Sequence, residues 1–376
     1  MKSDKLRLDS LTVGYNGIPL ISDISLSLAR GEIMTLIGPN GSGKSTILKS
    51  ITRHLAAISG TVYLDDKNMR LIDGRDIAKR LAVVLTERVR PDIMTCFEFV
   101  SAGRYPYTGS FGLLTAHDKE VVKNALEKVN ALDIAEKDIS QISDGQRQRI
   151  LLARAICQEP EVIVLDEPTS FLDIKHKIEL LGILSGMAKN SGISVVMSLH
   201  EIDLAQRISH KIVCVKGEHI AAYGTPEEIF SDDTIKTLYD IEEGSFNALL
   251  GNIELAKPCG DIRCFVVGGG GHGIPFYRAL QKRGIPFAAG ILLGNDVDLA
   301  VAERLAEYVV KTPPFMPASS GDIEAAKKII DSVGFVIDCG CPCGDLNQFN
   351  SQLLDYAEGQ GKTIVKTLAD LGEAEL

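Results

Sequence analysis

The sequence contains no tryptophan, and aromatic residues make up only 6% of its 376 residues. Long hydrophobic runs are also missing, since no stretch approaches the roughly 20 apolar residues that a membrane-spanning helix needs. The opening residues, MKSDKLRLDS, lack the apolar core of a secretory signal. We therefore expect a soluble chain in the cytosol, which acts at a membrane only through a partner protein.

Basic residues are the minority among the charged ones. Fifty Asp and Glu against 40 Lys and Arg give a formal net charge of −10, and neither half of the chain is basic. Nucleic acid is therefore not expected as a partner. The length exceeds what one hydrophobic core usually serves, which predicts two domains or three. The eight cysteines, five of them after residue 250, are expected to be reduced thiols in the cytosol.

The first 250 residues alternate short β-rich runs with helical patterns. Near-continuous apolar runs at 161–165 and 194–199 are typical of strands buried on both faces. Residues 117–131 have helical periodicity, and Thr115 and Asp118 have the spacing of a capping box. These features predict an α/β fold with a central, largely parallel sheet.

A second α/β pattern begins near residue 260 and indicates a small C-terminal domain. Gly244, Gly251 and Pro258 interrupt regular structure before it, so we divide the chain into domains 1–250 and 251–376. The expected elements of the second domain are strands at 263–267, 286–293, 334–338 and 363–367, and helices at 274–283, 298–309 and 322–332.

A glycine-rich run of the form G-x-x-x-x-G-K-S lies between an apolar strand and a helical pattern. Its glycines allow backbone N–H groups to surround phosphate oxygens, and the helix N-terminus adds positive potential. We expect Lys44 to contact the β- and γ-phosphates of ATP and the Ser45 hydroxyl to coordinate Mg²⁺. The predicted ATP-binding residues of this run are Gly38, Pro39, Asn40, Gly41, Ser42, Gly43, Lys44, Ser45 and Thr46.

Two carboxylates, Asp166 and Glu167, directly follow the apolar run Val162–Leu165. A buried strand would deliver both to the sheet edge beside the phosphate loop. Asp166 is predicted to hold Mg²⁺, and Glu167 stands where a general base for the attacking water belongs.

Four further features resemble ATP-binding-cassette (ABC) ATPases. Residues 142–149, ISDGQRQR, resemble the signature sequence, and residues 170–173, SFLD, resemble the D-loop. His200, which closes the second apolar run, resembles the switch histidine, and Tyr15 resembles the aromatic residue that stacks on adenine. Their order and spacing agree with the family over about residues 5–245.

This resemblance implies a P-loop NTPase fold with a RecA-like core, an antiparallel β subdomain and a helical subdomain at about 88–160. A small Rossmann-like α/β domain would follow it. ATP hydrolysis with Mg²⁺ is the implied activity, and the implied assembly is a head-to-tail homodimer. In such a dimer His200 contacts the γ-phosphate, and each ATP is completed across the interface by Ser143, Gly145, Gln146 and Asp173.

Two positions depart from the family pattern. Thr86 stands where a Gln usually ends a strand and reaches Mg²⁺, with Glu87 as a substitute if the loop shifts by one residue. The shorter Thr side chain predicts slower or differently coupled hydrolysis. Asp144 replaces the usual Gly of the signature, and we expect its carboxylate to point into solvent rather than at the γ-phosphate.

Segment 95–118 is similar to the region of importers for iron–siderophores, haem and cobalamin that receives the coupling helix of the permease. The matching residues are Val100, Gly103, Arg104, Pro106, Gly112, Leu114, Thr115 and Asp118. This resemblance implies a peripheral ATPase on the cytosolic face of the membrane, bound to a permease and served indirectly by a substrate-binding protein. The alternative is a soluble, non-transport ABC ATPase, although such proteins resemble tandem cassettes or carry coiled-coil insertions.

A second glycine run, Gly268–Gly273, fits G-x-G-x-x-G between an expected strand and helix. This resembles a dinucleotide-binding fingerprint, with Asp296 near the position of a ribose-binding acid. Two interpretations stay open. Either Gly268, Gly270 and Gly273 bind a nucleotide or another phosphate-bearing group, or the run is a structural turn.

Cys339, Cys341 and Cys343 alternate in sequence, which in an extended chain would place their thiols on one face. Three thiolates could bind Zn²⁺, Cu(I) or iron together with Cys264 or His272. Small buried thiols are the other interpretation. A ligand or redox response here would make the C-terminal domain a regulator of the ATPase.

Overall fold

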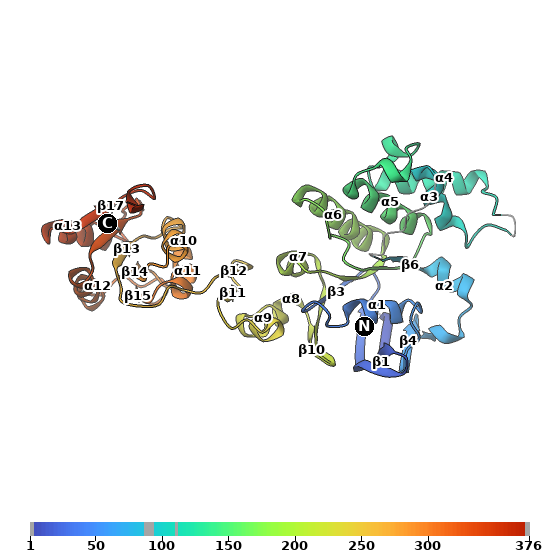
Figure 1. Cartoon of the computed structure of the whole chain (residues 1–376), viewed down its shortest axis with the longest axis horizontal. Coiled ribbons are helices and arrows are strands. Elements are labelled where there is room, and N and C mark those ends of the chain that lie inside the picture. Colours follow the sequence, from blue (N-terminus) through green and yellow to red (C-terminus); the bar gives the residue numbers. More distant parts are fainter. Residues whose placement is uncertain (1–3, 86–93, 110–111, 373–376) are drawn as a thin grey trace. The chain divides into compact units, whose positions relative to one another are not determined.

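The computed structural model describes residues 4–85, 94–109 and 112–372. The chain forms two compact units, Met1–Phe230 and Ser231–Leu376 (Figure 1). No helix within the described ranges is long and apolar enough to cross a membrane.

The division between the units comes earlier than the expected boundary at residue 250. Helix α9 (Asp232–Tyr239) packs on strand β11 (Ser245–Asn247), which forms a hairpin with β12 (Asn252–Glu254). Asp232 of α9 also forms an ion pair with Arg304 of the second unit. The segment 231–250 therefore packs with the C-terminal unit.

The first unit is built on a six-stranded sheet. All side chains of its strands β3, β7 and β8 are buried, as their largely apolar sequences predict. The five strands from β9 to β6 are parallel, and β10 is antiparallel to β9. The order across the sheet is β10 (His219–Gly224), β9 (Lys211–Lys216), β3 (Ile33–Ile37), β8 (Ser194–Ser198), β7 (Val162–Leu165) and β6 (Leu81–Val84).

A second, antiparallel sheet confirms the expected β subdomain. Its order is β2 (Ile18–Ala29), β1 (Asp4–Tyr15), β4 (Ser59–Leu64) and β5 (Lys67–Asn68). Leu11 and Ile21 of this sheet belong to the same hydrophobic core as Leu36 of β3 and Ile47 of helix α1 (Lys44–Ile51). The two sheets of the first unit are thus joined by one core that includes the helix after the phosphate loop.

Helices α3 (Cys96–Ser101), α4 (Ala116–Lys128) and α5 (Asp144–Cys157) pack against one another and lie together in Figure 1. Helix α4 begins with the predicted capping box, in which the Asp118 amide donates to Thr115 Oγ1 at 3.1 Å and the Thr115 amide donates to Asp118 Oδ2 at 2.9 Å. The other helices of the first unit are α2 (Gly74–Arg80), α6 (Ile174–Ser191), α7 (Ile202–Ile208) and α8 (Pro226–Ile229).

The second unit contains a five-stranded sheet in which all strands are parallel. The order is β15 (Tyr308–Lys311), β14 (Phe287–Leu292), β13 (Cys264–Val267), β16 (Phe335–Asp338) and β17 (Thr363–Val365). One hydrophobic core lies between the sheet and two helices, α10 (Ile274–Lys282) and α11 (Val297–Leu305). Another lies between the sheet and α12 (Ser320–Ser332) and α13 (Phe349–Gly359).

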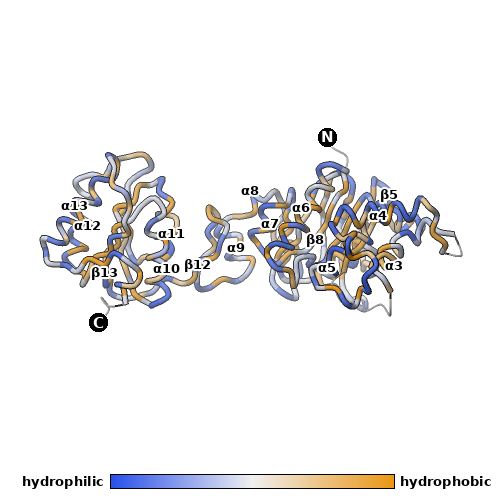
Figure 2. Tube along the Cα trace, turned by 90° about the horizontal axis from the view of Figure 1, so that it is seen from above, coloured by the Kyte–Doolittle hydropathy of each residue, from blue (hydrophilic) through white to orange (hydrophobic). Residues whose placement is uncertain are grey.

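Figure 2 shows hydrophobic residues concentrated along β13, which is the central strand of this sheet. The helices lie on both sides of the sheet, so the unit is a doubly wound α/β fold. The chain order reverses between β13 and β16, and that position is the topological switch point of the sheet.

Two elements of the second unit differ from the expectation. The helix expected at 298–309 ends at Leu305, and Tyr308–Lys311 instead forms strand β15, because its Tyr and two Val residues suit a strand beside β14. Helix α13 was not expected from the sequence. Its buried residues Phe349, Leu353 and Ala357 follow helical spacing.

Candidate active site

The first glycine run forms the predicted turn between β3 and α1. Gly38, Gly41 and Gly43 have φ angles of 147°, 77° and 95°, which glycine adopts far more readily than other residues. A side chain at Gly38 would clash with the carbonyl oxygen of Val215 on β9. Glycine at these three positions is therefore favoured by the backbone path of the loop.

Lys44, the first residue of α1, is buried against this loop. Its Nζ donates to the carbonyl oxygens of Gly38 and Pro39, each at 2.9 Å. Burial lowers the pKa of Lys44, while the carboxylates of Glu167 and Asp166 act in the opposite direction. The ammonium group therefore lies within electrostatic reach of both predicted catalytic carboxylates.

Asp166 and Glu167 follow β7 directly, and a third residue joins them. The hydroxyl of Ser198, at the end of β8, donates to Asp166 Oδ1 at 2.7 Å and accepts from the Glu167 amide at 2.9 Å. Ser198 is fully buried. Sequence reasoning missed it because one Ser within an apolar run looks like an ordinary strand residue. Its position two residues before His200 was the available signal.

Glu167 has a φ of 48°, which is uncommon for a residue with a side chain and recurs at strained functional positions. Its Oε1 lies 2.6 Å from Nε2 of His200, and its Oε2 accepts from the Ser170 hydroxyl at 3.1 Å. The predicted base and the predicted switch histidine are thus in direct contact.

Parallel strand pairing explains why these residues meet. Leu36 of β3 pairs with Ser198 of β8, and Leu165 of β7 pairs with Met197 of β8. The segments that follow β3, β7 and β8 therefore leave the sheet at one edge. That edge carries the phosphate loop, the two carboxylates and His200.

Tyr15 lies beside the same loop. Its hydroxyl is 3.3 Å from Oγ1 of Thr46, and about half of the residue is exposed. An exposed ring next to a phosphate loop fits the predicted contact with adenine.

The signature and D-loop residues lie at two neighbouring helix starts. Ser143 caps α5 in a capping box with Gln146, with hydrogen bonds of 3.0 and 3.3 Å. Asp173 caps α6 and accepts from the amide and Nδ1 of His176, both at 2.9 Å. A side chain at Gly145 would come within 3.3 Å of the His176 ring, so the two helix starts are in contact.

The two departures from the family pattern have different outcomes. Asp144 is the first residue of α5 and is exposed, as expected. Thr86 and Glu87 lie outside the described residues, so the prediction of altered Mg²⁺ coordination stays a prediction.

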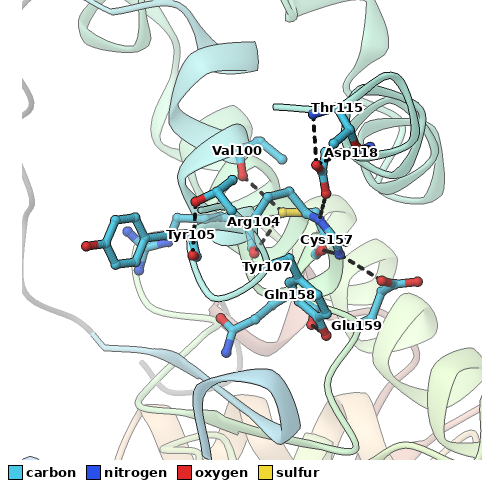
Figure 3. Close-up of polar contacts among 11 residues, drawn as sticks. Val100, Arg104, Tyr105, Tyr107, Thr115, Asp118, Cys157, Gln158 and Glu159 are labelled. Atoms are coloured by element: carbon cyan, nitrogen blue, oxygen red, sulfur yellow. Dashed lines mark hydrogen bonds and ion pairs between the residues drawn. The ribbon is translucent and has the colours of Figure 1, made fainter. Parts of the chain in front are cut away.

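Segment 95–118 is organised around a buried arginine (Figure 3). Arg104 is only 2% exposed and donates to Asp118 Oδ1 at 2.9 Å, to the Cys157 carbonyl at 2.7 Å and to Glu159 Oε2 at 2.7 Å. Its guanidinium also stacks over the Tyr107 ring. The arginine therefore joins this segment to the start of α4 and to the end of α5.

Other residues of the segment support the same junction. A side chain at Gly103 would clash with the Arg154 carbonyl of α5, and the Cys157 thiol donates to the Val100 carbonyl at 3.0 Å. Among the described residues of the segment, the large apolar side chains that are exposed are instead Tyr105 and Leu113, at 77% and 76%. Four of the residues that match the importers thus hold the segment in place, namely Val100, Gly103, Arg104 and Asp118.

The second glycine run lies between β13 and α10, as expected, but carboxylates already bind its amides. Both oxygens of Asp296 accept from the Gly270 amide, at 3.0 and 2.9 Å. Asp298 Oδ2 accepts from the Gly273 amide at 2.8 Å. Asp296 also caps α11 through the Asp298 amide. The acid expected at a ribose position is thus engaged with the loop itself.

The three alternating cysteines do not share one environment. Gly340 has a φ of 69° and turns the chain, so the extended path that would align the thiols is absent from this described loop. Cys339 is buried, Cys341 is half-buried and Cys343 is exposed. Across residues 4–85, 94–109 and 112–372, no three His, Cys, Asp or Glu side chains form a metal-ligand group. The structure therefore does not assemble the metal site considered from sequence.

Two different family models match the two units of the chain. A family model described as ABC transporter matches residues 21–170, and the model of the MJ0874 family matches residues 287–374. An uncharacterized ABC transporter ATP-binding protein of Methanocaldococcus jannaschii is 43% identical over 76% of this chain and 99% of its own length.

Two further relatives have named cargoes. The iron(3+)-hydroxamate import ATP-binding protein FhuC of Bacillus subtilis is 37% identical over 64% of this chain and 89% of its own length. The cobalamin import ATP-binding protein BtuD of Halobacterium salinarum is 29% identical over 86% of this chain and 85% of its own length.

Among solved structures, a dimeric post-hydrolysis state of the ATP-binding cassette MJ0796, bound to ADP and phosphate, is similar to this chain. It has a TM-score of 0.53 and 25% sequence identity, and the match covers 59% of this chain and 98% of that one. The similarity supports the same cassette architecture in the first unit.

Ser198→Ala tests the bridge between the two carboxylates. Loss of the hydroxyl removes one hydrogen bond from Asp166 and one from the Glu167 amide, which should lower the free energy of unfolding by about 1–3 kcal/mol. It should also raise the Mg²⁺ concentration for half-maximal ATPase activity by about tenfold, because groups that orient metal ligands have effects of this size. Ser194→Ala is the matched control, since Ser194 is equally buried at the other end of β8 and bonds to Gly31 and Ala29. An equal change in the Mg²⁺ dependence of ATPase activity in both variants would contradict the role of the Ser198 hydroxyl in orienting Asp166.

Asp118→Asn tests the buried pair in segment 95–118. The Thr115 hydroxyl and amide, and then Arg104, lower the pKa of Asp118 to about 2 against the opposing effect of its burial. The stabilisation is therefore complete above about pH 4 and lost as the pH falls through about 2. At pH 7 we expect the variant to be about 3 kcal/mol less stable. The difference between wild type and variant should shrink in urea unfolding between pH 4 and 2. Glu120→Gln, on the exposed side of the same helix, is the control and should leave the free energy of unfolding nearly unchanged. If the stability difference between wild type and Asp118→Asn does not depend on pH, the stabilisation does not come from the charged pair.

Proposed function

This chain belongs to the ATP-binding proteins of ABC transporters, and we propose that it is the ATPase subunit of an importer for an iron–siderophore, haem or cobalamin type of cargo. The observation that carries the cargo class is the similarity to FhuC and BtuD, which are import proteins for iron(3+)-hydroxamate and cobalamin. The match of segment 95–118 to such importers supports the same conclusion.

We assign the roles at the ATP site from its geometry. Lys44 exchanges its two loop carbonyls for the β- and γ-phosphates, and the amides of residues 38–46 surround the same phosphates. Tyr15 stacks on adenine. Glu167 accepts a proton from the attacking water, and His200, 2.6 Å from Glu167 Oε1, positions that carboxylate and contacts the γ-phosphate. The strained backbone of Glu167 holds the base in a fixed direction.

The residues present fit a Mg²⁺ ion. Ser45 and Asp166 supply hard oxygen donors, which Mg²⁺ prefers, and Ser198 fixes one oxygen of Asp166. When bound, the ion neutralises charge on the β- and γ-phosphates. Thr86 is proposed as a further contact on the basis of sequence alone.

We propose that two copies of the chain form a head-to-tail dimer. Ser143, Gly145, Gln146 and Asp173 would complete the ATP site of the other copy. Ser143 lies at the exposed start of the 14-residue helix α5, where the helix dipole favours a phosphate. The dimeric state of the similar MJ0796 cassette supports this arrangement.

We further propose that the dimer binds a membrane permease on the cytosolic side and receives cargo indirectly from a substrate-binding protein. The exposed Tyr105 and Leu113 would contact the permease. Tyr105 directly follows Arg104, which donates to the Cys157 carbonyl at the end of α5, so a contact at Tyr105 can be transmitted along α5 to Ser143.

Glu167→Gln should trap the ATP-bound dimer. The amide cannot accept the proton, so kcat should fall by about 100-fold or more while ATP binding persists. Size-exclusion chromatography with ATP and Mg²⁺ should show a dimer for this variant and a mixture for wild type. Glu227→Gln, on the surface of α8, is the control. Lys44→Ala should abolish the trapped dimer in the double variant. A Glu167→Gln enzyme with wild-type turnover would refute the role of the base.

The permease contact is tested with Tyr105→Ala combined with Leu113→Ala. The assay uses lipid vesicles that contain the permease encoded in the same genome. The concentration of the ATPase subunit that gives half-maximal cargo uptake should be about tenfold higher for the variant, because buried apolar anchors dominate such interfaces. ATPase activity without the permease should stay unchanged. Leu132→Ala, another exposed apolar position of the first unit, is the control. Uptake of none of the three cargo classes, and no stimulation by the permease, would favour the soluble ATPase instead.

A further inference from the structure

A cavity of about 390 Å³ lies between the end of α1 and the antiparallel sheet of the first unit. Its walls come from α1, β1, β4, the loop that joins α1 to β4 (residues 52–58) and the 3₁₀ turn Met69–Leu71. Helix α1 and strands β1 and β4 lie together in Figure 1. None of the lining residues belongs to the predicted ATP site, and the volume is that of a small-molecule site.

Most of the cavity wall is aliphatic. Leu11, Val62 and Met69 are buried, whereas Leu55 and Ile58 are partly exposed. Among the described residues that line the cavity there is no aromatic side chain, so it offers no ring on which a planar base can stack. An aliphatic chain suits this wall better than a nucleobase or an aromatic acid.

The charged part of the wall is positive. Arg53 and Arg70 line the cavity, and no Asp or Glu does so within the described ranges. Nη1 of Arg53 donates to the carbonyls of Met69 and Ile72, each at 3.0 Å. Nη2 of Arg70 donates to the Ala57 carbonyl at 3.4 Å. A guanidinium has five N–H donors in a fork that matches a carboxylate, so both arginines keep donors for an anionic ligand.

Arg53 reaches the cavity from an uncommon backbone conformation. It is the second residue after α1 and has a φ of 62°. Glycine is the usual residue in this left-handed conformation at a helix end, because it has no Cβ. The turn itself therefore favours glycine, and the arginine is explained by its side chain. Its Nη1 braces the 3₁₀ turn, and its Nε and Nη2 have no partner within the part of the chain that the structure describes.

We propose that this cavity binds a small aliphatic monocarboxylate. The carboxylate accepts hydrogen bonds from Arg53 and Arg70, and the alkyl chain packs on Leu11, Val62 and Met69. Both arginines are exposed, so the ligand reaches them without any opening of the fold. The site goes beyond the proposed transport function and does not depend on the cargo class.

The test measures binding of octanoate to the full-length chain at pH 7 by isothermal titration. Saturating ADP and Mg²⁺ keep the probe out of the phosphate loop. Acetate has the same charge without the chain, and octylamine has the same chain with the opposite charge. We expect octanoate to bind at least tenfold more tightly than either. Equal binding of acetate or of octylamine, or no saturable binding of octanoate, would overturn the proposal.

Arg53→Gly and Arg70→Gln identify the site. Glycine adopts the left-handed conformation without steric cost, so the first variant keeps the turn after α1. Each variant removes one charged donor group and should weaken octanoate binding by about tenfold. Urea unfolding of both variants verifies that the first unit stays folded.

Arg30→Gln is the matched control, because Arg30 is another exposed arginine of the first unit and does not line this cavity. It should bind octanoate as the wild type does. If all three variants have the same affinity for octanoate, the probe binds elsewhere and the assignment of this cavity is wrong.

Discussion

Parallel pairing of adjacent strands is the constraint on which the ATP site of the first unit and the paired loops of the second unit depend. Neighbouring parallel strands end at the same edge of a sheet, so the segments that follow them are brought together whatever their separation in sequence. In the first unit, the pairing of β3, β8 and β7 brings Lys44, Glu167 and His200 to one edge. In the second unit, the pairing of β13 with β16 places a glycine run beside a cysteine-containing loop. Chemistry is then decided by the few side chains at those edges.

The two glycine runs illustrate how much those side chains matter. Both lie between a buried strand and a helix, and both contain several glycines with positive φ. The first surrounds an ammonium group that donates to loop carbonyls, whereas the amides of the second are bound by two carboxylates. Similar backbone paths therefore present opposite charges to a ligand. A glycine pattern alone specifies a turn, and the charges around it specify what can bind.

Much of the first unit could be predicted from the sequence, because its motifs are local. The phosphate loop, the carboxylates after β7, the histidine after β8 and the capping box of α4 each depend on a short run of residues. Ser198 was missed, since its role arises only when β8 lies between β3 and β7, and its position two residues before His200 was the one local signal for it. In the second unit the order of the strands was not predictable, and β15 was hidden because the preceding helix and the strand are joined by only two residues, Ala306 and Glu307. The loop after β16 was expected to be extended, and the positive φ of Gly340 changed its geometry.

The Arg104 junction has a consequence for how such cassettes can change. One buried guanidinium binds groups from two other stretches of the chain: Asp118 near the start of α4, and the Cys157 carbonyl and Glu159 at the end of α5. A cassette that acquired a new segment 95–118 by recombination would inherit half of this junction, and the buried Arg104 would then lack its partners at the end of α5. The segment and the end of α5 are therefore expected to be exchanged together or not at all. The unit of modular inheritance is then larger than the exposed surface around Tyr105 and Leu113.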